Sequence, residues 1–372
     1  MPLDDFKRND QRWILSCDGG GIRGIITLRC LEALEERLGS GCLEIFDMFA
    51  GTSTGAIIAG ALASAQLGVS DLIKLYRERR KEIFDRSLLG FLHPLVTKYK
   101  KKPIHRLLRE SLDDRTLEEC PKDILITATD TVRSETIYFS AFHSRDASRY
   151  GTYKAVPLRH AIEASVSAPT YFPAHGRFVD GGVGVHNNPA YVAAVEALRY
   201  SYDKAQGQTS PYAESKVFVL SFSTGAQTGA MEAGEAMSTS SLGWAKYVLD
   251  EGLSQASYQQ SYVCQRELDG AEHVVTFYRY EVFLTPSVLA MAGVTAFDPG
   301  RLTLDAIDDA SFDVLDRIGA AFGSELKKNA FFIGSPQPPA AGHWERLGSP
   351  ALPGNYLETI LHEFWEIDQT LG

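Results

Sequence analysis

Short apolar runs that stop at glycines alternate with stretches of helical periodicity in the first part of the chain. Residues 13–17 form such a run before a glycine cluster, which is typical of a buried parallel strand. Leucines then recur at helical spacing up to Gly39, a residue that commonly ends helices. Residues 45–50 predict a second strand, and the small residues of 56–65 predict a helix that packs closely on a sheet. This alternation predicts an α/β fold in which helices cover a mostly parallel sheet.

The rest of the chain continues the pattern with less regularity. Ser70 is the predicted cap of a helix that runs to Arg80. Further strands are predicted at residues 124–128, 136–139, 217–221 and 274–280, and a long helix at 243–268. Residues 83–96 are apolar, aromatic and interrupted by Gly90 and Pro94, and a basic stretch follows them.

Composition narrows the functional classes. The 372 residues are 44% hydrophobic, which is enough for a large core, and the net charge of −10 argues against nucleic acid as a partner. The five cysteines form no CxxC pair and no Cys/His cluster, so we expect neither a zinc site nor a disulfide framework. The N-terminus lacks an apolar signal region, and the apolar stretch 49–65 is interrupted by polar residues. These features predict a cytoplasmic protein without a membrane span.

The first chemical motif is Gly51-Thr-Ser53-Thr-Gly55, which lies between a predicted strand and a predicted helix. A serine at such a turn is the context of a nucleophile elbow, in which small flanking residues leave room for a strained serine backbone. A chance Gly/Ser loop is the plain alternative. The context favours a nucleophilic serine, Ser53.

The second motif is the glycine loop that follows the first strand, with the sequence Gly19-Gly-Gly-Ile-Arg-Gly24. Its consecutive glycines offer closely spaced N–H groups for a developing negative charge, as in an oxyanion hole. The same string also fits a dinucleotide fingerprint, and Asp47 stands at about the expected distance for that alternative. Two interpretations of Arg23 stay open. It lies near the oxyanion or a phospholipid phosphate, or it is a surface or structural arginine.

The third motif is Asp180-Gly-Gly, which follows the apolar pair Phe178-Val179. Alone it reads as an ordinary turn, but beside the other two motifs it supplies a carboxylate base for Ser53. A histidine would complete an ordinary triad, and His186 is the best placed candidate. The other histidines lie in no catalytic string.

Together the three strings resemble those of the patatin-like phospholipase family. Residues 164–173, 178–189 and 306–319 also fit its pattern, so the resemblance covers roughly residues 10–322. It implies a three-layer patatin-like fold, a Ser53–Asp180 dyad with Gly51 and Gly55 in the elbow, and no cofactor or metal. It further implies an oxyanion hole around Gly19, Gly20, Gly21, Arg23 and Gly24.

The implied activity is hydrolysis of fatty-acyl esters in membrane phospholipids or galactolipids. Two alternatives are a triad esterase or thioesterase on soluble esters, and a non-catalytic lipid-binding or storage protein. The Asp-Gly-Gly loop is one residue longer than is usual before Asn187-Asn-Pro, which affects the shape of the site rather than the dyad.

We expect residues 83–102 to be a lid or a membrane-docking segment, unless they simply pack under the core. Apolar side chains there stand beside cations that suit an anionic surface, which would allow transient membrane contact. These are Phe84, Leu88, Leu89, Phe91, Leu92, Leu95, Lys98, Lys100, Lys101 and Lys102. Residues 323–372 are a C-terminal extension without a predicted role.

Overall fold

A computed structural model describes residues 3–85, 97–141, 152–200, 210–227, 235–268, 275–328 and 343–349, and residues 358, 360, 362 and 364. Its sheet has eight strands in the order β4-β3-β2-β1-β6-β7-β8, and β5 pairs with β3. The strands are β1 (Gln11–Cys17), β2 (Met48–Gly51), β3 (Asp123–Asp130), β4 (Glu135–Ser140), β5 (Phe178–Asp180), β6 (Lys216–Phe222), β7 (Val275–Val282) and β8 (His343–Leu347). Only β4 and β5 run antiparallel to their neighbour.

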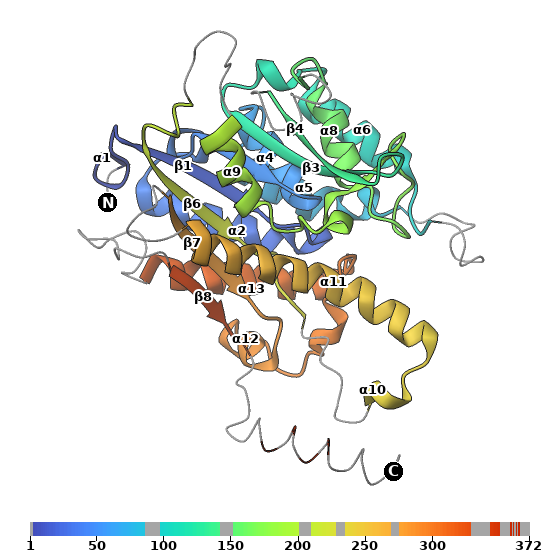
Figure 1. Cartoon of the computed structure of the whole chain (residues 1–372). Helices are drawn as coiled ribbons and strands as arrows, with labels where there is room; N and C mark the ends of the chain where they lie inside the picture. Colours follow the sequence, from blue (N-terminus) through green and yellow to red (C-terminus); the bar gives the residue numbers. More distant parts are fainter. Residues whose placement is uncertain are drawn as a thin grey trace.

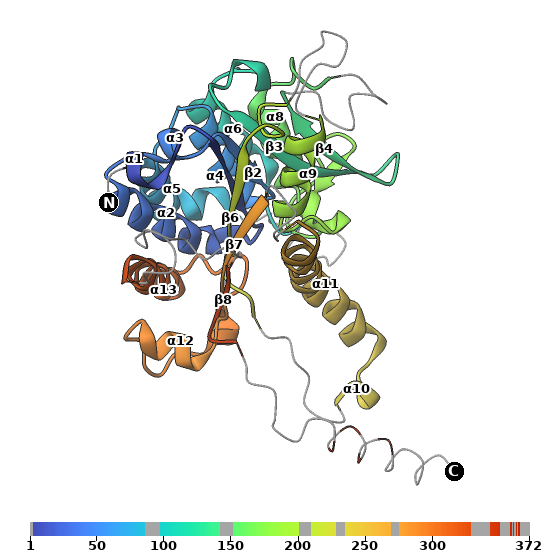
Figure 2. The same cartoon turned by 60° about the vertical axis from the view of Figure 1, so that its left-hand side comes forward.

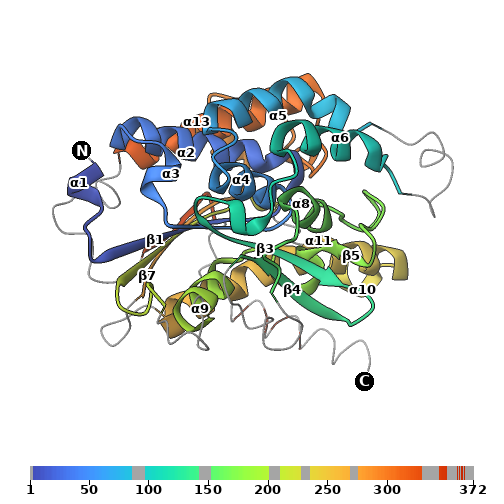
Figure 3. The same ribbon diagram turned by 90° about the horizontal axis from the view of Figure 1, so that it is seen from above.

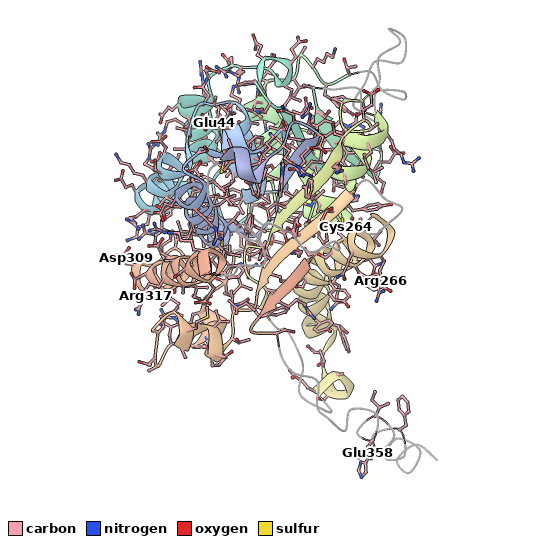
Figure 4. The ribbon with its side chains drawn as sticks, turned by 90° about the vertical axis from the view of Figure 1, so that its left-hand side faces the viewer. Glu44, Cys264, Arg266, Asp309, Arg317 and Glu358 are labelled. Atoms are coloured by element: carbon pink, nitrogen blue, oxygen red, sulfur yellow. The ribbon has the colours of Figure 1, made fainter. Side chains whose placement is uncertain are left out.

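Helices cover both faces of this sheet (Figures 2 and 3). One face carries α2 (Gly24–Leu38), α4 (Thr54–Ala63), α5 (Val69–Ile83), α6 (Lys101–Leu112), α8 (Leu158–Ser165) and α13 (Asp309–Lys328). The other face carries α9 (Ala190–Tyr200) and α11 (Ser241–Val263). The short helices are α1 (Leu3–Phe6), α3 (Cys42–Ile45), α10 (Glu235–Ser238) and α12 (Pro286–Met291). Figure 4 shows Asp309 and Arg317 of α13 on one side of the sheet, and Cys264, just beyond α11, on the other.

Alternate residues of the central strands belong to two separate hydrophobic clusters, one on each face of the sheet. Trp13 and Leu15 of β1 join the cluster under α2 and α4, whereas Ile14 joins the cluster under α9. Because both faces are buried, β1 is an almost continuous apolar run, as a central parallel strand requires. The predicted α/β class with a mostly parallel sheet flanked by helices is confirmed.

Two predicted element boundaries are wrong. Residues 45–47 are not part of the second strand, because Ile45 ends α3 and the Asp47 carboxylate accepts the Trp13 amide at 2.8 Å. Helix α5 begins at Val69 after an N-cap at Gly68, and Asp71 accepts the Gly68 amide, so Ser70 lies inside the helix. In both places a side-chain carboxylate binds a backbone amide and sets the boundary.

Part of the segment 83–102 is built into the fold. Leu88, Leu89, Phe91, Leu92 and Leu95 lie outside the described residues. Phe84 is buried, and its ring meets the Tyr99 ring edge-on at 5.2 Å between centroids.

Three of the four lysines in this segment have partners within the chain. Lys98 pairs with Asp305, Lys100 pairs with Asp85, and Lys101 donates to the Glu163 carbonyl. The Lys98 and Lys100 side chains are still 42% and 48% exposed, and Lys102 is exposed as well. Membrane docking by this segment stays a prediction.

The predicted boundary near residue 322 lies inside a helix. Helix α13 runs through it to Lys328, and β8 extends the same sheet beside β7 (Figure 1). Residues 323–328 and 343–347 are thus continuous with the preceding fold.

Candidate active site

Ser53 lies in the tight turn between β2 and α4. Its backbone has φ 56° and ψ −122°, a left-handed conformation that costs energy in a residue with a side chain. The flanking glycines make this turn sterically feasible. A Cβ on Gly51 would lie 2.1 Å from the Gly55 carbonyl oxygen, and a Cβ on Gly55 would lie 2.1 Å from the Cys17 carbonyl oxygen. The turn therefore has the geometry of a nucleophile elbow.

Asp180, at the end of β5, lies close enough to the Ser53 hydroxyl for that hydroxyl to lower the pKa of its carboxyl. Its carboxylate is buried and accepts the Gly182 amide at 2.8 Å. Burial raises the pKa of Asp180 to about 6, although the Ser53 hydroxyl and the Gly182 amide oppose this rise. A carboxylate with such a pKa is a better base near neutral pH than an exposed one.

The end of α8 holds both halves of this pair. The Ser165 hydroxyl accepts the Ser53 amide at 2.8 Å, and the Ser167 carbonyl accepts the Asp180 amide at 3.1 Å. Lys101 donates to the Ser167 hydroxyl, and burial lowers the pKa of Lys101 to about 8. A lysine expected at a membrane surface thus braces the segment that holds Asp180.

The glycine loop adjoins Ser53. A Cβ on Gly19 would lie 3.2 Å from the Ser53 Cβ and 2.3 Å from the Asn187 Oδ1, so a larger residue would displace the Asn187 side chain. The Gly19 amide donates to the Asn187 carbonyl at 3.0 Å, and the Arg23 and Gly24 amides donate to carbonyls of the loop itself. Among the described residues, the structure records no acceptor for the Gly20 and Gly21 amides. This corrects the prediction that the whole loop offers donors.

Three residues that the sequence motifs did not assign to the oxyanion hole hold the loop. Thr224 donates from its hydroxyl to the Gly19 carbonyl at 2.7 Å, and the Leu304 carbonyl accepts the Ile22 amide at 2.9 Å. Asn187, whose carbonyl binds Gly19, was noted only as part of an Asn-Asn-Pro string. Thr224 lies in the string 221–225, in which a serine replaces the glycine that is usual in the family, and Leu304 stands in no motif.

The dinucleotide alternative gains no support. Asp47, the acid it requires, accepts the Trp13 amide and pairs with Lys7 at 2.9 Å. Arg23 is half-buried in the short 3-10 turn Gly21–Arg23 that closes the loop.

The His186 ring is directed at Tyr138. Its Nε2 lies 2.9 Å from the Tyr138 hydroxyl, and the two rings pack edge-on. The groups that lower the pKa of Asp180 are the Ser53 hydroxyl and the Gly182 amide, and His186 is not among them.

The described residues contain no group of three or more His, Cys, Asp or Glu side chains that could hold a metal ion. No described helix is both long enough and apolar enough to cross a membrane.

Residues 15–194, which contain Ser53, Asp180 and the glycine loop, match the model of the patatin-like phospholipases. Residues 15–194 belong to the patatin-like phospholipase family. The chain is 31% identical over 230 residues to an intracellular phospholipase A2 of Caenorhabditis elegans, an alignment that covers 60% of this chain and 20% of that protein. It is 31% identical over 224 residues to patatin-like protein 2 of Oryza sativa subsp. indica, covering 50% of this chain and 53% of that protein. The chain thus spans about half or less of the length of these relatives.

Solved structures of patatin-like and related phospholipases are more distant. VipD from Legionella pneumophila aligns with a TM-score of 0.36 at 13% identity, covering 82% of this chain and 67% of that one. The human GIVD cytosolic phospholipase A2 aligns with a TM-score of 0.35 at 12% identity, covering 86% and 59%. Scores this low do not establish a common fold.

Proposed function

We propose that this protein is a lipid acyl hydrolase that cleaves fatty-acyl esters through an acyl-serine intermediate on Ser53. The observation that carries the proposal is the nearness of the Ser53 hydroxyl to the buried Asp180 carboxylate, whose pKa that hydroxyl lowers. A strained serine and a carboxylate of raised pKa are two features that acyl transfer requires together.

In this mechanism Asp180 accepts the Ser53 proton while Oγ attacks the ester carbonyl. The tetrahedral intermediate collapses to acyl-Ser53, and the alcohol leaves with the proton that Asp180 had taken. Asp180 next takes a proton from water, whose oxygen attacks the acyl-serine. The fatty acid leaves, and the proton returns to Ser53.

The Gly20 and Gly21 amides are the proposed donors to the oxyanion. Their lack of described acceptors supports this role, since such donors are left unpaired until charge develops. Loss of one donor of this kind typically costs about 3–4 kcal/mol of transition-state stabilisation.

An apolar rim supports a fatty-acyl substrate. Val183 and Val185 lie three and five positions after Asp180, and more than half of each side chain is exposed. Val185 also has φ 90°, which is costly for a β-branched residue. The fold gains little from two exposed valines there, whereas an acyl chain would bury them.

The test compares phosphatidylcholine vesicles with a soluble short-chain ester, with products identified by mass spectrometry. The wild type should release fatty acid from the vesicles, and Ser53→Ala and Asp180→Asn should each abolish the release. Ser70→Ala, which changes an exposed serine of α5, is the matched control and should keep full activity. Turnover of the soluble ester alone would favour the soluble esterase, and no turnover of either would favour a non-catalytic lipid-binding protein.

A further inference from the structure

A buried ion pair lies at the base of the glycine loop. Arg279 of β7 donates through both terminal nitrogens to Asp18, with 2.7 Å from each nitrogen to its carboxylate oxygen. The side chains are 0% and 3% exposed. Asp18 is the last residue before Gly19, so the pair is anchored one residue from the loop.

The pair continues into a larger charged network. Arg279 also donates to the Ser221 hydroxyl at 2.9 Å and to Glu281 at 3.4 Å, and Arg346 of β8 donates to Glu281 at 3.3 Å. Two carboxylates and two guanidinium groups balance, which leaves no net charge in the core. The network joins the loop to the last two strands of the sheet.

Stability alone is a weak explanation for this network. Desolvation of buried ions offsets most of their attraction, and well-packed apolar side chains often stabilise a fold equally well. A bidentate Arg–carboxylate pair does, however, fix direction as well as distance. The Arg279–Asp18 pair therefore matters here because it fixes the position and direction of Asp18.

The backbone beside the pair is fixed at successive residues. The Asp18 amide donates to the Phe222 carbonyl at 3.1 Å, and the Gly19 amide donates to the Asn187 carbonyl at 3.0 Å. Because Asp18 is held through its backbone and its side chain, and Gly19 through its backbone, the direction of the next two amides is restricted. Those are the Gly20 and Gly21 amides.

We infer that Arg279 is a positioning residue, which holds the glycine loop through Asp18 so that the Gly20 and Gly21 amides meet the oxyanion. This role rests on the proposed ester hydrolysis. It assigns part of the active-site support to β7 and β8, which lie outside residues 15–194. The strands beyond the family match then contribute to the geometry of the reaction.

The test is Arg279→Lys, which keeps the positive charge but not the two-point contact. We expect kcat on a soluble ester to fall by about tenfold or more while KM changes little, because misplaced donors lose contact with the transition state. Arg29→Lys is the matched control. Arg29 also makes a two-point contact, with Asp316 at 2.7 and 3.0 Å, but it joins α2 to α13 and should leave kcat unchanged.

Each outcome separates the two proposals. A folded Arg279→Lys with wild-type kcat, or with a changed KM alone, would overturn the positioning role and leave the hydrolase proposal intact. A wild type that turns over no ester would refute the hydrolase proposal itself. If Arg279→Lys does not fold, Arg346→Gln replaces it, because it breaks the half-exposed outer link and should lower kcat by a smaller factor. Wild-type kcat in Arg346→Gln would then overturn the inference.

Discussion

The serine turn and the glycine loop adjoin each other, but they are held in different ways. The turn is shaped by its neighbours in sequence and on the adjacent strand. A Cβ at Gly51 would clash with the Gly55 carbonyl, and a Cβ at Gly55 would clash with the Cys17 carbonyl. The loop is held from a distance, by Asn187, Thr224, Leu304 and the Arg279–Asp18 pair. A local steric constraint can be read from a short motif, whereas support from remote residues cannot.

The largest effect should come from adding a methyl group at the serine turn. In Gly55→Ala the new Cβ would meet the Cys17 carbonyl at 2.1 Å, and β1 cannot move without disturbing the sheet. Overpacking of this kind costs about 1–3 kcal/mol or more, and the displaced turn should abolish ester hydrolysis. The measurements are kcat and the thermal unfolding midpoint.

Gly41→Ala is the matched control for that change. A Cβ there would lie 3.8 Å from the nearest atom, the Glu35 carboxylate, so activity should stay at the wild-type level. Wild-type activity in Gly55→Ala would show that the turn is not sterically determined.

The same contrast separates what the sequence predicted from what it did not. The dyad residues and both elbow glycines stood in short strings whose chemistry requires particular residue types at particular spacings. The sequence predicted too many amide donors to the oxyanion. It could not show that the Gly19 amide is already bound, because its acceptor, the Asn187 carbonyl, lies 168 positions away (187 − 19). The sequence did not reveal that Lys98 and Lys100 form ion pairs, because their partners, Asp305 and Asp85, stand in no motif.

A smaller effect is expected at the remote support of the loop. Thr224→Val keeps the shape of a buried side chain but removes the hydroxyl that donates to the Gly19 carbonyl. A net hydrogen bond is worth about 1 kcal/mol, so kcat should fall roughly fivefold. Full activity in a steady-state assay would mean that the loop does not depend on Thr224.

A separate effect concerns stability and pH rather than the rate of the reaction. Burial raises the pKa of Asp180 to about 6 from an ordinary 3.8, so the folded state binds this proton more tightly than the unfolded state. Ionisation of Asp180 therefore lowers the free energy of unfolding. This loss is absent below about pH 4, is complete above about pH 6, and is of the order of 2–3 kcal/mol. Asp180→Asn removes that loss.

Thermal unfolding at two pH values checks this sign. Asp180→Asn should unfold at a higher temperature than the wild type at pH 8, and at about the same temperature at pH 4. A variant that is less stable than the wild type at both would show that the Asp180 carboxylate supports the fold rather than the reaction.

The central claim is that Asp180, and no histidine, is the base for Ser53. The most direct test is the pH dependence of kcat/KM on a soluble ester, measured side by side for the wild type and His186→Ala. Both should show a single acid limb near the Asp180 pKa of about 6, with activity rising as the carboxylate ionises. His186→Ala should keep most of the wild-type activity, because His186 contacts Tyr138 rather than the dyad. Loss of activity at every pH in a normally folded His186→Ala would contradict the dyad and establish a triad in its place.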